Sequence, residues 1–213
     1  MLTDFQLKII KHSAELFSKQ GFTAVKTDEI AQKLAISKKT LYENFESKEE
    51  ILRTAVDYFL KNIDVELQAI NQRLENSSGE DLIEILIDLW DIEIQSLKIF
   101  TNELIKDIIR LFPDLWDLIM NFRDERFKLY FNKIYSMGID QGIIRKDISE
   151  DILYLIFNYS TKHIMIPDII KDLPLSTKNV MEQIFQIILS GALTPEYQNK
   201  YYQKLGTNNQ VKQ

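Results

Sequence analysis

The chain has 213 residues, a length that can bury a sizeable core. Apolar residues make up 45% of it and only four residues are proline, which favours a helical protein. It contains no cysteine, so a disulfide framework, a thiolate nucleophile and a cysteine-bound metal are excluded. The net charge is −6, but the acidity lies in the second part, because residues 1–61 carry ten Lys and Arg against nine Asp and Glu.

The first predicted helix begins at Thr3, which can form a capping box with Gln6, and ends at Gly21. Its apolar stripe is expected to pack across the back of the two helices that follow. Thr3, Asp4 and Gln6 interrupt any apolar signal-peptide core, so we expect no signal peptide and a cytoplasmic protein.

Residues 26–48 predict two short helices joined by a tight turn, followed by the start of a third helix. Thr27 is a good N-cap for the first helix and Ser37 for the second. Leu41 and Phe45 mark the inner face of the second helix. The other side of that helix then presents Lys38, Lys39, Thr40, Tyr42, Glu43 and Asn44. This pattern predicts a helix-turn-helix that reads DNA.

Several residues of this region stand in the order typical of one protein family. They are Gly21, Ile30-Ala31, Ser37-Lys38, Thr40-Leu41-Tyr42, Phe45 and Lys48. Together they resemble the N-terminal domain of the TetR family of bacterial repressors, and the resemblance covers residues 5–55. It implies that the C-terminal part is also helical and holds a cavity for a small effector.

Two residues depart from the family's pattern. Ala35 stands where the family usually has glycine, so the turn would force a residue with a β-carbon into the left-handed region, at about 1 kcal/mol. Lys39 stands where a glycine often lets the backbone approach the bases, so the operator sequence cannot be borrowed from relatives. Lys48, at a helix N-terminus, is expected to hold a phosphate. The predicted DNA-binding residues are Thr27, Ser37, Lys38, Lys39, Thr40, Tyr42, Asn44 and Lys48.

A long helix over residues 48–76 is predicted to join the two parts of an all-α protein without a flexible linker, and Asn76 to Gly79 should stop it. We expect a three-helix DNA-binding domain over 1–47 and a helical effector-binding and dimerisation domain over 48–195. Residues 196–213 form a polar tail that should be frayed.

The second part is predicted as helices over residues 81–97, 100–111, 113 to 138 or 142, 149–167 and 177–191, with an irregular segment over 168–175. Its most apolar run, 152–166, contains Asn158, Lys162 and His163 and is short, so it is predicted as a buried helix and not as a membrane span.

Two surfaces of the second part are candidate binding sites. The helix over 81–97 is apolar on most faces, which fits either a core or a ligand cavity, and the effector residues chosen by position are Trp90, Ile94, Phe127 and Tyr130. The last two helices carry more apolar surface than one partner helix would cover, which predicts a four-helix bundle across a two-fold axis. The predicted dimer residues are Leu153, Ile156, Tyr159, Val180, Ile184 and Ile188.

The two alternative classes of function are an enzyme and a helical adaptor. An enzyme is disfavoured, because the two histidines, His12 and His163, lie in different parts of the chain and no metal-ligand spacing or phosphate loop occurs. We therefore predict no catalytic residue, metal or cofactor. A helical adaptor that binds only protein is an open alternative. The favoured prediction is a dimeric repressor that binds a palindromic operator in double-stranded DNA and is released by a small hydrophobic effector.

Overall fold

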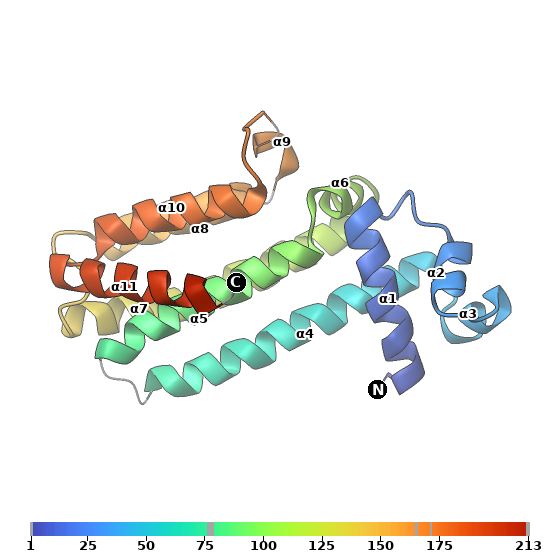
Figure 1. Cartoon of the computed structure of the whole chain (residues 1–213), viewed down its shortest axis with the longest axis horizontal. Helices are drawn as coiled ribbons and strands as arrows, with labels where there is room; N and C mark the ends of the chain where they lie inside the picture. The colour runs from blue at the N-terminus through green and yellow to red at the C-terminus, as the bar shows by residue number, and fades with distance from the viewer. Residues whose placement is uncertain (1, 76–78, 165, 171, 212–213) are drawn as a thin grey trace. The chain divides into compact units, whose positions relative to one another are not determined.

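The computed structural model describes residues 2–75, 79–164, 166–170 and 172–211, and these residues form eleven helices (Figure 1). The predicted all-helical fold is confirmed, and the described residues add one isolated β-bridge between Ile144 and Leu193. None of the helices in these ranges combines the length and apolar character that crossing a membrane requires. In chain order they are α1 (Asp4–Gln20), α2 (Thr27–Lys33), α3 (Lys38–Asn44), α4 (Lys48–Glu75), α5 (Gly79–Ile99), α6 (Asn102–Leu111), α7 (Pro113–Asp140), α8 (Glu150–Ile164), α9 (Pro167–Ile170), α10 (Thr177–Ala192) and α11 (Pro195–Val211).

The chain divides into two compact units, each assembled from separate segments. The first unit contains Met1–Val65 and Gln95–Asn121, and the second contains Glu66–Ile94 and Phe122–Gln213. Helices α4, α5 and α7 therefore each contribute to both units. The division predicted from sequence, at residues 47/48 and 195/196, follows continuous segments and stays a prediction.

The first unit is built around α1, which packs against α2 and α6. The predicted capping box of α1 is present, since Gln6 N donates to Thr3 Oγ1 at 3.2 Å and Thr3 N donates to Gln6 Oε1 at 3.1 Å. The core side chains are buried and come from α1 to α4 and α6, among them Ile9, Phe17, Ile30, Leu41, Leu52 and Ile108. Burial of this apolar set holds the two short helices α2 and α3, which would not be stable alone.

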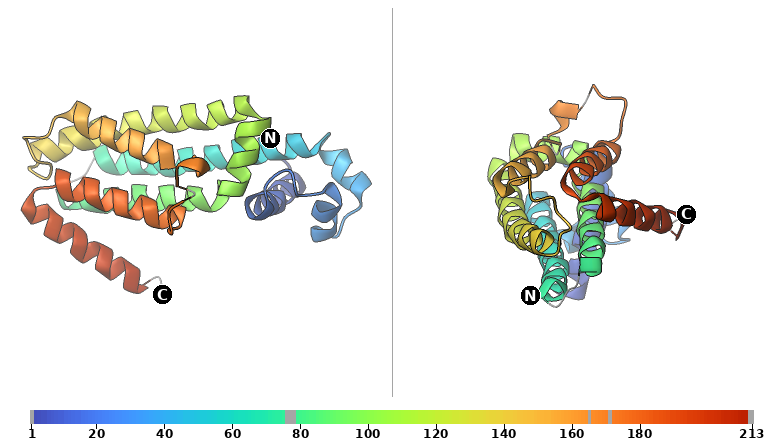
Figure 2. Two further views of the ribbon diagram at one scale, coloured as in Figure 1. Left: turned by 90° about the horizontal axis from the view of Figure 1, so that it is seen from above. Right: turned by 90° about the vertical axis from the view of Figure 1, so that its left-hand side faces the viewer.

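The second unit contains α8 and α10 side by side, as the views of Figures 1 and 2 agree. Its core is rich in aromatic rings, and Phe127 packs on both Phe131 and Phe157 with centroid distances of 5.6 and 5.2 Å. Gly138 lets the chain fold back closely, because a β-carbon there would lie 2.5 Å from Ile144 Cδ1. The close approach lets the amides of Ile143 and Ile144 donate to the Gly138 carbonyl at 2.8 and 2.9 Å.

Three local predictions differ from the structure. The predicted frayed tail is wrong for residues 196–211, which lie in α11, and Tyr201 on this helix is only 2% exposed. The short helix α9 lies in the segment predicted as irregular. Thr27 is the first residue of α2 and not its N-cap, because Lys26 holds that position and its amide donates to Glu29 Oε2 at 3.1 Å. At the start of α4, the Ser47 hydroxyl accepts from Glu50 N at 3.0 Å, and the Glu50 carboxylate accepts from Glu46 N.

The long helix was predicted to stop at residues 76–79. Residues 76–78 lie outside the described residues, and Gly79 is the first residue of α5.

Candidate nucleic-acid interface

The turn between α2 and α3 is a Schellman motif with alanine in the position that glycine usually fills. Ile36 N donates to the Ala31 carbonyl at 3.0 Å, and Ala35 N donates to the Gln32 carbonyl at 3.1 Å. Ala35 has a φ of 53°, and no other non-glycine residue of the described chain has a positive φ. The prediction that Ala35 is left-handed is therefore confirmed.

Helix α3 is fixed by a cap and a buried anchor. The Ser37 hydroxyl accepts from Thr40 N at 2.9 Å, as predicted for the N-cap, and Leu41 is fully buried. The outward side presents Lys38, Lys39, Tyr42 and Glu43 as exposed residues, while Thr40 and Asn44 are half-buried. The amide of Asn44 donates to the Thr40 carbonyl at 2.9 Å.

Both acidic residues near this face are paired with its lysines. Lys38 Nζ lies 3.1 Å from Asp28 Oδ1, and Lys39 Nζ lies 3.9 Å from Glu43 Oε1. Both pairs are exposed, so a phosphate can compete with the carboxylates for the ammonium groups. Thr27 is half-buried beside this face, and its hydroxyl is 3.5 Å from the hydroxyl of Tyr42.

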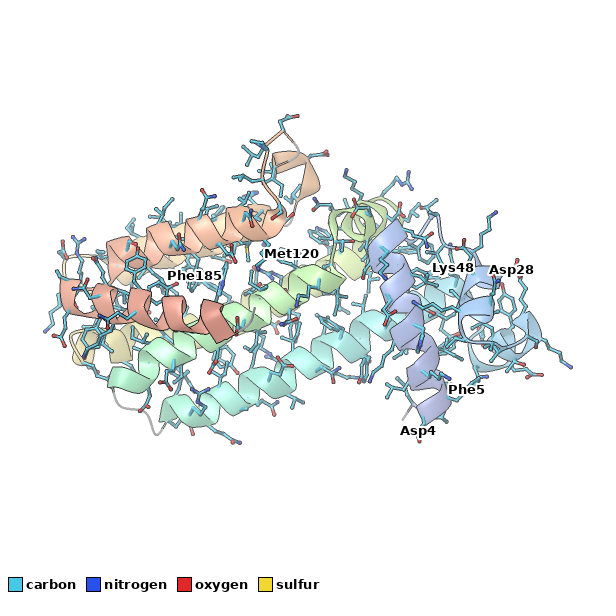
Figure 3. The ribbon with its side chains drawn as sticks, viewed as in Figure 1. Asp4, Phe5, Asp28, Lys48, Met120 and Phe185 are labelled. Carbon is cyan, nitrogen blue, oxygen red and sulfur yellow. The ribbon has the colours of Figure 1, made fainter. Side chains whose placement is uncertain are left out.

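Lys48 points its ammonium group into the loop that precedes α2, in the region labelled in Figure 3. Its Nζ donates to the carbonyls of Phe22 and Val25, both at 2.8 Å, and lies 4.1 Å from the centre of the Phe22 ring. Burial lowers the pKa of Lys48, although the charges of Asp107 and Glu29 oppose that shift. Because two of its three N–H groups donate to these carbonyls, at most one N–H of Lys48 is left for a phosphate.

A second support for the same loop, which was not predicted from the sequence, comes from Asp107 on α6. Thr23 N donates to Asp107 Oδ2 at 2.6 Å, and Arg110 donates to both Asp107 Oδ1 and Thr23 Oγ1, at 2.8 and 3.1 Å. The approach requires Gly21, which has a φ of 80° and whose β-carbon would lie 3.0 Å from Asp107 Oδ2. The available signal was an acid on the apolar face of α6, next to Ile108.

The residues predicted to bind an effector fall into two groups in the second unit. Phe127 and Tyr130 line an apolar cavity of about 90 Å³, which is also bounded by α5, α8 and α10. Trp90 and Ile94 are buried but are not part of its lining. Trp90 instead stacks on Phe185 with ring centroids 4.5 Å apart.

The residues predicted to form the dimer interface are divided by the packing of α8 on α10. Leu153, Val180 and Ile188 are buried within the chain, and Ile184 is half-buried against the same core. Ile156 and Tyr159 are exposed. They belong to an exposed apolar stripe that also contains Ile152 and Leu155 on α8, and Ile187 is exposed on α10.

Residues 9–55 match the family model described as bacterial regulatory proteins, tetR family. The chain is 29% identical over 140 residues to YerO, an HTH-type transcriptional regulator of Bacillus subtilis (strain 168), which covers 64% of this chain and 48% of that protein. It is 34% identical over 98 residues to IcaR, the HTH-type negative transcriptional regulator of the biofilm operon icaADBC of Staphylococcus aureus (strain Newman), covering 44% and 50%. The chain thus spans about half the length of these curated relatives.

Solved structures share the fold over nearly the whole chain. A TetR-family transcriptional regulator from Marinobacter aquaeolei VT8 covers 95% of this chain and 96% of its own, with a TM-score of 0.66 and 24% identity. The ketosteroid transcriptional regulator KstR2 of Mycobacterium tuberculosis covers 91% and 97%, with a TM-score of 0.60 and 20% identity. A regulator from Saccharomonospora viridis in complex with choline has a TM-score of 0.61 at 18% identity, covering 91% and 100%.

The residues that match the family model include the turn between α2 and α3 and the whole of α3. That model describes regulators and not enzymes. The described residues include no group of three His, Asp and Glu side chains that could hold a metal ion. The helix-turn-helix domain of the chain is that of the tetR family of bacterial regulatory proteins, and it is the part that carries the sequence likeness.

Proposed function

We propose that the protein is a DNA-binding transcriptional regulator in which α3 enters the major groove of a palindromic operator. The observation that carries this proposal is the outward face of α3, where Lys38, Lys39 and Tyr42 are exposed on a helix held by the buried Leu41. Lys39 is the most available of them, since its side chain is 87% exposed and its pairing with Glu43 is long. The proposed contacts are Thr27, Ser37, Lys38, Lys39, Thr40, Tyr42, Asn44 and, through its remaining N–H, Lys48.

The dimer is proposed to form through α8 and α10. Its proposed contacts are residues that are exposed in the single chain, in place of the predicted ones that are buried within it. Ile152, Leu155, Ile156 and Tyr159 recur at one-turn spacing on α8, and Ile187 on α10 is 71% exposed. A second copy of the chain would cover this face and build a four-helix bundle, with Ile184 at its edge. Two reading helices would then meet the two half-sites of a palindrome.

Repression with release by a small hydrophobic effector is the proposed mode of regulation. The relative IcaR is named a negative regulator, and one neighbour of the same fold was solved in complex with choline. The lining of the cavity beside Phe127 and Tyr130 is almost entirely apolar, which favours an apolar ligand. At about 90 Å³ it is smaller than ordinary ligand pockets of about 300–1,000 Å³, so an effector must enlarge it. A ligand that binds the enlarged state better shifts the population toward that state.

The experiment that tests this function is a binding titration of labelled DNA from the region upstream of the protein's own gene, accompanied by selection from a random DNA pool. Lys39→Ala and Tyr42→Ala should weaken binding, while Lys106→Ala, an exposed lysine on α6, should not. Each lost phosphate contact should flatten the log–log salt dependence by about 0.9. If neither DNA source binds, the adaptor alternative is favoured.

A further inference from the structure

The first unit contains an open cleft of about 620 Å³ between α1, α4 and the junction of α5 with α6. This volume lies within the range of about 300–1,000 Å³ that is ordinary for small-molecule sites. The cleft is distinct from the apolar cavity of the second unit, because no residue lines both.

The floor of the cleft is apolar and its rim is basic. Ile10, Phe17, Leu52 and Val56 are buried floor residues, and the rings of Phe59 and Phe100 meet edge to face at 5.8 Å. The charged side chains of the lining are Lys11, Lys19, Lys98 and Glu15. The lining thus has more cationic than anionic side chains, whereas the whole chain has a net charge of −6.

The two ends of the cleft differ. At one end, Lys11 Nζ lies 5.6 Å from the centre of the Tyr58 ring, so this cation already has a partner. At the other end, the Ser18 hydroxyl donates to the Ile99 carbonyl at 2.7 Å, so the backbones of Lys19 and Lys98, the chain neighbours of these two residues, lie near each other there. Within the described residues neither lysine forms an ion pair. The carboxylate of Glu15 is bonded to Lys33 at 2.7 Å, and its pKa is lowered by that bond and, to a smaller extent, by the charge of Lys19.

We propose that this cleft binds an amphipathic anion, with its apolar body on the floor and its acidic group beside Lys19 and Lys98. The apolar body removes floor surface from water, which is the larger favourable contribution. The acidic group adds a favourable charge interaction with these lysines. This site goes beyond the proposed function and does not depend on it, because binding there can be measured without DNA.

The test is calorimetric titration of the full chain with decanoate below its micellar concentration, compared with decanol and decyltrimethylammonium of equal chain length. Decanoate should bind most tightly. Lys19→Gln and Lys98→Gln should each weaken it about two- to fivefold, as loss of a partly exposed ion pair would. The matched variant Lys106→Gln, on α6 but outside the cleft, should leave the affinity unchanged.

A filled cleft gives an independent readout. Ala14 lines the cleft on α1, so Ala14→Trp should abolish decanoate binding, with folding checked by circular dichroism. In contrast, Ala192→Leu, which fills the cavity of the second unit, should leave decanoate binding intact. Equal binding of decanol, an equal loss in Lys106→Gln, or blockage by Ala192→Leu would each overturn the proposal. If Ala14→Trp does not fold, the lysine variants, which are exposed, decide the matter alone.

Discussion

Ala35 is the residue at which the helix-turn-helix departs most from unstrained backbone. Its φ of 53° places a β-carbon in the left-handed region, at about 1 kcal/mol, and the two Schellman hydrogen bonds hold it there. Glycine would remove that strain but would add freedom to the unfolded chain, an effect of about 0.4–1 kcal/mol in the opposite direction. We expect the free energy of unfolding of Ala35→Gly, measured in urea, to stay level or to rise by at most about 1 kcal/mol.

A matched control for this variant is Ala24→Gly, since Ala24 is exposed and has no positive φ. That change should only add freedom to the unfolded chain and should lower the free energy of unfolding. An equal loss in both variants would mean that Ala35 is not strained.

Lys48 is a residue with two candidate roles that one variant can separate. Its ammonium supports the carbonyls of Phe22 and Val25, so Lys48→Ala should lower the free energy of unfolding by about 1–3 kcal/mol. If its third N–H also holds a phosphate, binding to all DNA sequences should weaken alike and the salt slope should fall by about 0.9. Lower stability with an unchanged slope would limit Lys48 to supporting the loop.

At the scale of elements, α6 is tied to the loop between α1 and α2 by one buried carboxylate. Asp107 accepts from Thr23 N, and Arg110 bridges both residues. Asp107→Ala leaves a part-buried amide without its acceptor, which should lower the free energy of unfolding by about 1–3 kcal/mol. The control Lys106→Ala, next to it but exposed, should change it by less than about 0.5 kcal/mol. Equal thermal stability of the two variants would show that the tie contributes nothing.

The elements also show which parts of the structure a sequence can predict. The outward face of α3 was predicted, because it follows from residues within one turn of each other. The left-handed Ala35 was predicted from the resemblance to a family that usually has glycine at that position. The tie between Thr23 and Asp107 joins residues 84 positions apart, so no local pattern contains it. Helix α11 was also not predicted, because its sequence is largely polar and the burial of Tyr201 depends on packing that no local pattern shows. The dimer set mixed buried with exposed positions, because Leu153 and Ile156 are told apart only once α8 is packed on α10.

At the scale of the whole molecule, the exposed apolar face of α8 and α10 should decide the oligomeric state. Ile187→Glu changes a side chain that is 71% exposed, so the monomer fold should survive while the dimer is lost. We expect light scattering to show monomers and operator affinity to fall steeply. Ile169→Glu, on α9 and 60% exposed, is the control that should stay dimeric. Persistent dimers of Ile187→Glu would move the interface to another surface.

The proposed signal would travel along α4, which is continuous over 28 residues and belongs to both units. At about 1.5 Å per residue it is roughly 42 Å long, so a small tilt at its far end displaces the residues near Lys48. An effector that enlarges the cavity should therefore raise thermal stability and weaken operator binding, and DNA should weaken effector binding by the same factor.

Filling the cavity from within tests this coupling without knowledge of the effector's identity. Ala192 is buried and lines the cavity, so Ala192→Leu should occupy part of its roughly 90 Å³ at little cost in packing. The variant should bind the operator as the unchanged protein does, because the proposed operator-binding state is the one with the small cavity and the substitution favours that state. A library of apolar compounds that raises the melting temperature of the unchanged protein should no longer do so with Ala192→Leu. If a stabilising compound leaves operator affinity untouched at saturation, the cavity and the reading helices are not coupled.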